Sequence, residues 1–195
     1  MGARKKKLAG YPSIESIQKE LYRVKYQRRY SRVLRSTIYT LIVAAAIAVL
    51  VAMIWLPVLH IYGTSMAPTL EEGDIVVSVK GDSFKAGDLV SFYIGNKIFV
   101  KRYNAGAGQW VDIDEEGNVY VDGKMLDEPY VLEKAFGNCN ISLPYQVPEE
   151  QIFCMGDHRK TSLDSRNSAV GCIAEDQIVG KIVFRVWPFP QFGVI

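Results

Sequence analysis

Three short segments hold side chains whose types and spacing could carry out hydrolytic chemistry. Residues 63–69, Gly-Thr-Ser-Met-Ala-Pro-Thr, place Ser65 in a segment that turns sharply. A strand-like run ends at Lys101, and residues 156–166 read Gly-Asp-His-Arg-Lys-Thr-Ser-Leu-Asp-Ser-Arg. Amide hydrolysis by a serine needs a base that takes the hydroxyl proton. Taken singly, each segment is ordinary, because a serine in a turn or a lysine on a strand is usually a solvated surface group.

Composition excludes several other chemistries. With two His among 195 residues and no CxxC pair, the usual zinc sites are excluded. No GxxxxGK[ST] or GxGxxG pattern is present, so a phosphate-binding loop has no support. The 49% apolar content is too high for a disordered chain.

The elements that must position these groups begin with a basic N-terminal segment. Residues 1–35 hold 11 Lys+Arg and two Glu, a net charge of +9, whereas the other 160 residues carry −7. Ser13 and Glu15 could start a helix that runs to Arg35. Residues 1–10 are predicted to be a disordered tail. For residues 13–35, a basic helix on anionic headgroups and a disordered tail both remain open.

An apolar stretch follows the basic segment. Residues 36–59 contain no charge, and their helix would be about 36 Å long, enough to cross a bilayer. Tyr39 and Trp55 lie near its ends, as interfacial aromatic residues do, and Pro57 would end or kink the helix. A cleaved signal peptide has a shorter apolar core, so an uncleaved transmembrane anchor is favoured over cleavage or a buried core helix. The positive flank predicts a cytoplasmic N-terminus, with residues 60–195 outside.

Residues 60–195 read as an antiparallel β domain. Short β-rich runs alternate with turn signals such as Gly87-Asp88, Gly95-Asn96 and Asp122-Gly123, and no long amphipathic helix interrupts them. The runs are 75–79, 89–94, 98–103, 110–113, 119–121, 151–155 and 178–186. Residues 110–113 and 119–121, followed after a turn by Met125-Leu126, resemble a meander of hairpins. The fold class is therefore predicted as mainly β, with an antiparallel sheet domain after one transmembrane helix. Cys139, Cys154 and Cys172 fall in this domain, and one disulfide or three reduced thiols both remain open.

Together, the segments resemble the bacterial type I signal peptidases, which use a serine–lysine dyad. The family pattern has Ser-Met-x-Pro-Thr just after a transmembrane segment, here residues 65–69, and then Gly-Asp-x-Val, here 87–90. A Lys-Arg pair and a Gly-Asp-Asn-Arg … Ser-x-Asp-Ser-Arg box follow in order, here 101–102 and 156–166. The resemblance covers roughly residues 36–190 and is to the single-span form of Gram-positive bacteria.

The resemblance implies a role for each matching residue. Ser65 is expected to be the nucleophile and Lys101 the general base, with Ser162 orienting the lysine amine. Asp164 and Arg166 are expected to form a supporting ion pair, and Arg102 is expected to be structural. The Ser65 backbone N–H is the expected oxyanion donor. A second donor is unassigned, because Gly63 stands where some members have a serine.

The chemistry explains why the lysine must be buried. A free lysine, with a pKa of about 10.4, is protonated at neutral pH and cannot act as a base. Residues 98–100, Ile-Phe-Val, form an apolar run that could bury the amine of Lys101 and lower its pKa. Lowering that pKa by about 3 would cost roughly 4 kcal/mol of solvation free energy.

The family cleaves exported preproteins after small residues, and its substrate is expected to bind as an extended strand over shallow apolar pockets. Candidate pocket residues flank the dyad: Ile61, Tyr62, Met66, Phe99 and Val100. Ordinary core packing is the alternative for each of these five. Expected partners are signal peptides and the lipid bilayer, with no nucleic acid, metal or cofactor. The expected location is the bacterial cytoplasmic membrane, with the catalytic domain on its outer face.

Two departures leave rival interpretations. His158 replaces the usual Asn of the Gly-Asp-Asn-Arg box, which raises a Ser-His-Asp triad as an alternative. The residues after Lys101-Arg102 also depart from the family's usual Gly-x-Pro-Gly-Asp, so the hairpin there could differ.

Two other functions are alternatives to a signal peptidase. Self-cleaving repressors share a Ser–Lys dyad but carry a DNA-binding domain, for which residues 1–35 are too short. A non-enzymatic precursor-binding domain is the remaining alternative.

Overall fold

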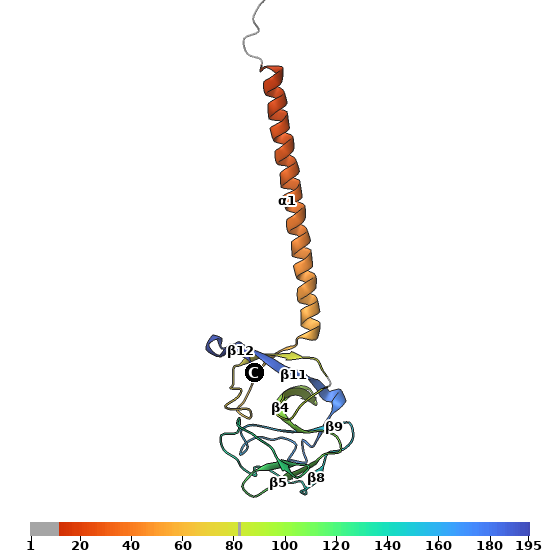
Figure 1. The fold of residues 1–195 in the computed structure, drawn as a ribbon, viewed down its shortest axis with the longest axis vertical. Helices are drawn as coiled ribbons and strands as arrows, with labels where there is room; N and C mark the ends of the chain where they lie inside the picture. The colour runs from red at the N-terminus through yellow and green to blue at the C-terminus, as the bar shows by residue number, and fades with distance from the viewer. Residues whose placement is uncertain (1–11, 82) are drawn as a thin grey trace, which may run out of the picture. The chain divides into compact units, whose positions relative to one another are not determined.

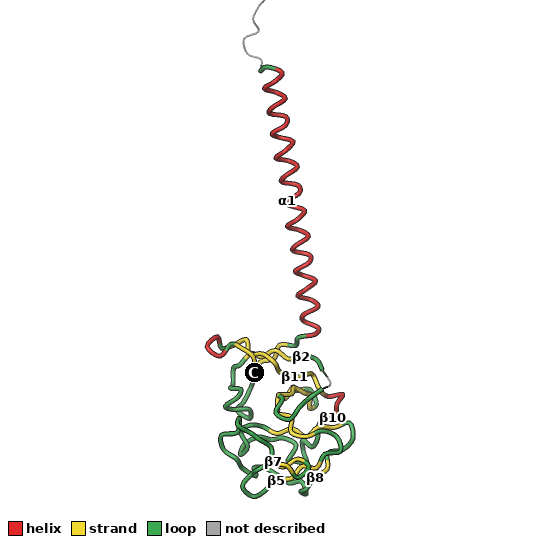
Figure 2. Tube along the Cα trace, viewed as in Figure 1, coloured by secondary structure: helices red, strands yellow, loops and turns green. Residues whose placement is uncertain are grey.

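The structure, a computed structural model, describes residues 12–81 and 83–195. The tail predicted at residues 1–10 lies outside the described residues. The chain divides into two compact units between Val51 and Ala52, a helical N-terminal unit and a β-rich C-terminal unit. Figures 1 and 2 show the elements of each unit.

One uninterrupted helix, α1 (Ile14–Trp55), begins in the N-terminal unit, and its last four residues belong to the C-terminal unit. Ser13 caps its start, because the Ser13 hydroxyl accepts a hydrogen bond from the Ser16 N–H at 3.2 Å. The helix holds no Gly or Pro, and its 42 residues span about 63 Å. It is long and apolar enough to cross a membrane. A basic stretch lying flat on headgroups would need a break in this helix, and residues 14–55 contain none.

The helix ends four residues before the predicted end of the apolar span at residue 59. Proline has no N–H to donate and disfavours helical backbone in the residue before it, so Pro57 prevents the helix from continuing. The Pro57 carbonyl instead accepts the N–H of Ser78 at 2.9 Å. Residues 58–60 then form a strand, so the start of the β domain lies inside the range predicted for the membrane helix.

The β-rich unit contains an eight-stranded and a four-stranded sheet, and every strand pair is antiparallel. The larger sheet has the order β1-β2-β11-β3-β4-β9-β10, with β12 paired to β11, and the smaller has the order β7-β6-β5-β8. The strands of the larger sheet are β1 (Val58–His60), β2 (Ile75–Val79), β3 (Leu89–Ile94), β4 (Lys97–Ala105), β9 (Gln151–Met155), β10 (Ile173–Ala174), β11 (Ile178–Trp187) and β12 (Gly193–Val194). The smaller sheet contains β5 (Trp110–Ile113), β6 (Val119–Val121), β7 (Lys124–Met125) and β8 (Tyr145–Gln146). Two 3₁₀ turns, η1 (Glu175–Gln177) and η2 (Phe189–Gln191), flank β11.

The predicted mainly β, antiparallel fold class is confirmed. Five of the seven predicted strands have the observed bounds, and β4 and β11 extend beyond theirs by one to two residues at an end. The alternating burial of β2 and β5 shows why these strands could be predicted from the sequence, since every second side chain enters the core. Long loops join these short strands, and Figure 2 shows how much of the unit they form.

Candidate active site

Ser65 lies in the turn-rich segment between β1 and β2. The Ala67 N–H donates to the Thr64 carbonyl at 3.1 Å, and the Leu70 N–H donates to the Met66 carbonyl at 2.9 Å. The side chains of Met66 and Leu70 are buried in one apolar cluster of the core. Gly63, with a φ of +81°, makes the turn that leads into the segment. The serine is therefore carried on a turn that its apolar neighbours hold in place.

The backbone of Ser65 has one group engaged and one group free. Its carbonyl accepts the N–H of His158 at 3.1 Å, which ties the segment to the loop after β9. Among the hydrogen bonds of the described residues, its own N–H donates to none. A free N–H on the residue that carries a nucleophile is placed to stabilise the oxyanion that forms during acyl transfer.

Lys101 lies in β4 opposite Val90 of β3, and its side chain turns into the protein. Only 3% of the residue is exposed. Its Nζ donates a hydrogen bond to the Ser162 Oγ at 3.0 Å. Burial lowers the pKa of Lys101 from its usual 10.5 to about 8, against the opposing influence of the Asp164 carboxylate. The amine is therefore much closer to neutral than a solvated lysine would be.

Gly156 connects the serine segment to the lysine. A Cβ built on Gly156 would lie 2.1 Å from the Ser162 Oγ and 2.6 Å from the Ser65 carbonyl oxygen. The Ser162 hydroxyl that contacts Lys101 is thus packed against the same glycine as the backbone of Ser65. No hydrogen bond between the Ser65 Oγ and the Lys101 Nζ occurs within the described part of the chain. What joins the two residues is the close packing around Gly156, which only a residue without a side chain permits.

The loop that carries Ser162 is held by the ion pair that the sequence analysis expected. Arg166 Nε lies 2.8 Å from Asp164 Oδ1 and Arg166 Nη2 lies 2.9 Å from Asp164 Oδ2, and both residues are buried. Asp164 Oδ2 also accepts the N–H of Gly156 at 2.9 Å. Burial alone would raise the pKa of Asp164, but the Arg166 guanidinium holds it below its usual value. The carboxylate therefore stays ionised and fixes the glycine on which the site depends.

Arg102 points away from the site and binds neighbouring structure. Its Nε lies 2.7 Å from Asp157 Oδ1, and its guanidinium lies 3.7 Å from the centre of the Tyr130 ring. It also donates to the hydroxyl of Thr69 at 3.1 Å and to the carbonyl of Gly87 at 2.6 Å. These contacts fasten the loop after β9 to β4 and are consistent with the structural role expected for Arg102.

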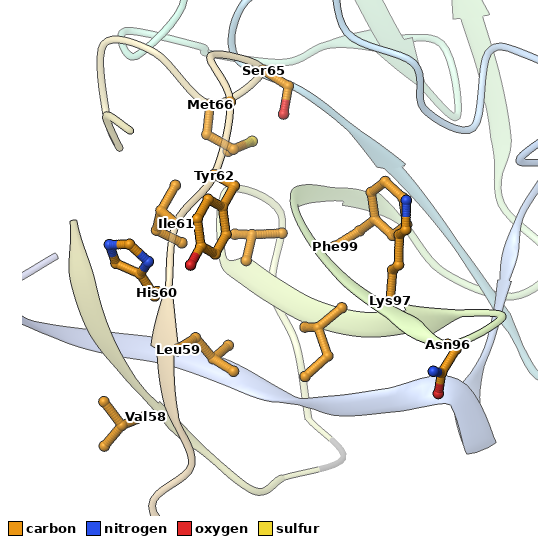
Figure 3. A pocket seen from close by; sticks show the side chains of 13 residues that line it. Val58, Leu59, His60, Ile61, Tyr62, Ser65, Met66, Asn96, Lys97 and Phe99 are labelled. Atoms are coloured by element: carbon orange, nitrogen blue, oxygen red, sulfur yellow. The ribbon is translucent and has the colours of Figure 1, made fainter. Parts of the chain in front are cut away.

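A groove of about 700 Å³ extends from Ser65 (Figure 3). One wall is the chain from Val58 to Met66, and the other is the start of β4, from Asn96 to Val100. All five expected pocket residues line it: Ile61, Tyr62, Met66, Phe99 and Val100. Ile61 and Met66 also belong to a core cluster, so packing and groove lining are combined in the same side chains. His60 lines the groove too, edge-to-face with Tyr62 at 4.5 Å.

Both walls of this groove offer backbone without a neighbouring strand. β1 is the edge strand of the larger sheet. Residues 97–100 of β4 pair with β3 on one side, whereas the pairing of β4 with β9 begins only at Arg102. An extended peptide in the groove could therefore form strand hydrogen bonds with either wall.

The structure gives no support to His158 as the base. Its imidazole Nδ1 lies 2.8 Å from the hydroxyl of Thr161, and among the described residues it makes no hydrogen bond to Ser65 Oγ or Asp157. Only its backbone N–H reaches the serine segment. The imidazole is thus engaged by its own loop rather than by a nucleophile.

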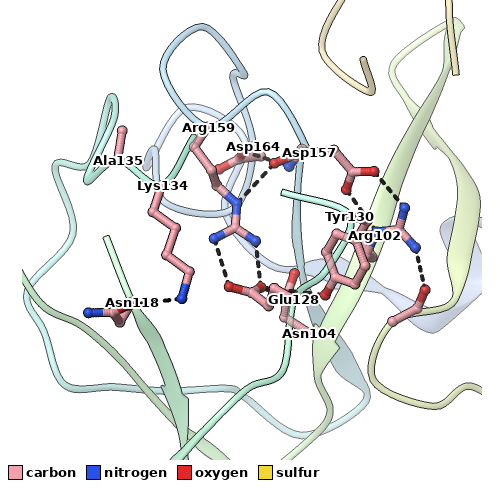
Figure 4. Close-up of polar contacts among 12 residues, drawn as sticks. Arg102, Asn104, Asn118, Glu128, Tyr130, Lys134, Ala135, Asp157, Arg159 and Asp164 are labelled. Carbon is pink, nitrogen blue, oxygen red and sulfur yellow. Dashed lines mark hydrogen bonds and ion pairs between the residues drawn. The ribbon is translucent and has the colours of Figure 1, made fainter. Parts of the chain in front are cut away.

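A buried ion pair, which was not predicted from the sequence, lies beneath the loop after β9. Arg159 Nη1 and Nη2 lie 3.0 and 2.5 Å from the two carboxylate oxygens of Glu128 (Figure 4). Arg159 Nε also donates to the Gly156 carbonyl at 3.2 Å. Glu128 occupies an irregular loop with no motif around it, so no signal in the sequence identified it. The pair ties the long loop before β8 to the glycine of the site.

The described residues contain no group of three or more His, Cys, Asp or Glu side chains arranged to hold a metal ion. All three cysteines are free thiols, so the structure has no disulfide among them. Burial raises the pKa of the Cys172 thiol to about 11, and that of the fully buried Cys154 is raised as well. Neither thiol is therefore prone to form a thiolate at neutral pH.

Comparison with known proteins identifies the family to which this chain belongs. Residues 34–187 match the family described as signal peptidase, peptidase S26. Signal peptidase IB of Staphylococcus aureus (strain COL) is 37% identical over 153 residues, covering 68% of this chain and 78% of that protein. Thylakoidal processing peptidase 1, chloroplastic, of Arabidopsis thaliana is 34% identical over 142 residues. That match covers 64% of this chain and 40% of the plant protein, so the chain spans less than half of that relative's length.

A signal peptidase I from Enterococcus faecalis V583 is a similar solved structure. It has a TM-score of 0.44 and 21% identity, and the match covers 51% of this chain and 97% of that chain.

Proposed function

The chain belongs to the signal peptidase family, peptidase S26, and is a serine peptidase of the signal peptidase I type, so we propose that it cleaves signal peptides from exported preproteins. In this proposal Ser65 is the nucleophile and Lys101 is the base. The observation that carries the proposal is the buried amine of Lys101, which contacts Ser162 on the loop packed against the Ser65 backbone. Burial makes a neutral amine available near neutral pH, and no solvated lysine would provide that.

In the proposed reaction, the Ser65 Oγ attacks the scissile carbonyl carbon while the neutral Lys101 Nζ takes the hydroxyl proton. A rotation of the two side chains brings these atoms together in the substrate complex, since catalytic hydrogen bonds often tighten only there. The Ser65 N–H stabilises the resulting oxyanion. The Lys101 ammonium then protonates the departing amine as the C–N bond breaks. Lys101 next takes a proton from a water molecule whose oxygen attacks the acyl carbon. The Lys101 ammonium then gives that proton to the Ser65 Oγ as the ester C–O bond breaks, which releases the new carboxyl end and restores Ser65 and the neutral amine.

Ser162 and the Asp164–Arg166 pair serve this reaction through position. Ser162 accepts one N–H of the lysine amine at 3.0 Å and so limits where the amine points. Asp164 holds Gly156 by its N–H, and Gly156 separates Ser162 from the Ser65 carbonyl. Their contribution is to keep the amine within reach of the serine rather than to exchange protons with the substrate.

The groove beside Ser65 accounts for the form of the substrate. A signal peptide in extended form pairs with the open edge of residues 97–100, and every second side chain faces the apolar wall. Ile61, Met66 and Val100 are half-buried or buried there, which leaves shallow pockets suited to small side chains. Small residues before the scissile bond fit this wall, and bulky ones do not.

Helix α1 serves as the membrane anchor in this proposal. It contains the apolar stretch from residue 36 and the basic stretch before it. By the positive-inside rule, the basic stretch lies in the cytoplasm and the β domain lies outside. Anchoring keeps the site near the membrane in which the apolar part of a signal peptide also resides, and this raises the effective substrate concentration. The location would be the bacterial cytoplasmic membrane.

The test uses the full chain in detergent with an exported precursor, and mass spectrometry of the products. Ser65→Ala and Lys101→Met are each expected to abolish cleavage. Lys124→Met, which alters an exposed lysine on β7, is the matched control and should cleave normally. Full activity of Lys101→Met would show that another group is the base.

A further inference from the structure

A second hollow, of about 220 Å³, is lined in part by the residues that follow Ser65 and Met66 in the chain. Ser65 and Met66 line the first groove, whereas the next two residues, Ala67 and Pro68, line the second hollow. His158 lines it as well, and the His158 N–H is bonded to the Ser65 carbonyl at 3.1 Å. The two hollows are therefore lined by adjacent residues of the segment that carries Ser65.

The outer wall of the second hollow comes from the loop before β8, through Leu132 and Glu133. This part of the loop is anchored on its N-terminal side by two buried cations. Glu128 forms its double contact with Arg159, and the Tyr130 ring lies against Arg102 (Figure 4). Breaking a buried ion pair is costly, so this segment is held in place rather than free to fold away.

The same segment is anchored again just after Leu132. Lys134 Nζ donates to the Asn118 side-chain oxygen at 2.9 Å, and Glu133 forms an ion pair with Lys160 across the hollow. Leu132, between these anchors, is 81% exposed. A leucine held out in water on a fixed segment, beside a hollow, offers apolar surface that a bound ligand would cover.

The occupant follows from the position of the hollow, and the argument rests on the proposed function. A peptide cleaved at Ser65 must pass the nucleophile on both sides of the scissile bond. Its residues before that bond take the first groove, so the residues after it leave Ser65 in another direction. The second hollow adjoins Ser65 through Ala67 and Pro68 and is much smaller than the groove, which suits a short contact.

We propose that the second hollow binds the first residues of the mature protein, immediately after the scissile bond, and that Leu132 favours an apolar side chain there. Ala67 and Pro68 form the inner wall of this subsite and Leu132 the outer wall. The Glu133–Lys160 ion pair lies at its rim and carries no net charge, so it does not oppose a neutral side chain. Preference after the scissile bond is thus separate from the preference for small residues before it.

The test is a series of peptide substrates identical up to the scissile bond, with Gly, Leu or Asp at the first or the second position after it. For the full chain, kcat/KM for Leu should exceed that for Gly by about fourfold or more at one of these positions, the ratio that one buried methylene gives. Leu132→Ser should reduce this ratio to nearly one. Met125→Ser, which alters a residue that is 60% exposed on β7, is the matched control and should keep the full ratio.

The outcomes separate this inference from the function beneath it. Cleavage of the whole series with no dependence on the residue after the bond, or a ratio that survives Leu132→Ser, would overturn the subsite and leave the peptidase intact. Failure of the unaltered chain to cleave any peptide of the series would count against the proposed function, and against this inference with it. A thermal melt of Leu132→Ser that matches the melt of the unaltered chain shows that the variant is folded.

Discussion

The buried amine of Lys101 predicts a specific dependence of cleavage on pH. Burial lowers its pKa from the usual 10.5 to about 8, whereas the Asp164 carboxylate raises it and the Arg166 guanidinium lowers it. The proposed mechanism needs the neutral amine, so activity should follow the deprotonation of this one group. The perturbation is therefore the pH itself, with Lys101 as the titrating residue.

The size of the effect follows from the two pKa values. Their difference corresponds to about 3 kcal/mol in favour of the neutral form. At pH 7, about one Lys101 amine in ten is then neutral, against about one in three thousand for a solvated lysine, a gain of about 300-fold. We expect kcat/KM to rise about tenfold per pH unit well below pH 8 and to reach a plateau above about pH 9.

The assay is cleavage of a peptide substrate by the full chain in detergent, from about pH 6 to about pH 10 at constant ionic strength. The Lys124→Met control should give the same dependence of kcat/KM on pH as the unaltered chain, because Lys124 is an exposed residue of β7 in the smaller sheet. Activity that still rises about tenfold per pH unit up to about pH 10, as a lysine with the usual pKa of 10.5 would give, would show that burial does not tune this amine. Activity that does not vary with pH across the whole range would refute Lys101 as the base.

The same burial carries a cost in stability, with a definite sign. The folded-state pKa of Lys101 is lower than the unfolded-state value, so the unfolded chain binds more protons between pH 8 and 10.5. The penalty is fully present below about pH 8 and is relieved as the pH rises toward 10.5. Lys101→Met should therefore raise the free energy of unfolding by up to about 3 kcal/mol at neutral pH, measured by denaturant titration. A Lys101→Met variant that is less stable at neutral pH would contradict this account.

Two further predictions concern the loop that carries Ser162. Gly156→Ala should lower kcat by about a hundredfold, because the added Cβ would lie 2.1 Å from the Ser162 Oγ and displace Ser162. Rate measurements, with a thermal melt to check folding, test this prediction. Normal turnover would show that the close packing around Gly156 is not needed. Asp164→Asn should lower the free energy of unfolding by about 3–5 kcal/mol, because it leaves the buried Arg166 without its carboxylate partner. Denaturant titration measures this change, and an unchanged midpoint would refute the prediction.

Local patterns account for the parts of the fold that were predicted correctly. The charge-free run after residue 36 predicts a long helix, and the runs between glycine turns predict the main strands. β1, β8, β10 and β12 were missed because each has only two or three residues, too few to show an alternating pattern. Their pairing is decided by neighbouring strands that are distant in sequence.

The candidate site divides in the same way. The order of the motifs predicts Ser65, Lys101 and Ser162 as site residues, since each belongs to a short segment of recognisable composition. Glu128 could not be found, because it lies alone in a loop and gains its partner, Arg159, only when two loops meet. The second hollow also forms only where the segment after Ser65, the loop before β8 and the loop after β9 come together, so no single stretch of sequence predicts it.

By itself, the sequence determined the kind of elements, their order along the chain and the residue types that could react, because these depend on near neighbours. Only the tertiary structure decided that the Lys101 amine is buried and that Gly156 packs between Ser162 and the backbone of Ser65. The physical reason is that desolvation depends on every atom around a group, and most of the atoms around this amine come from strands and loops far from it in sequence.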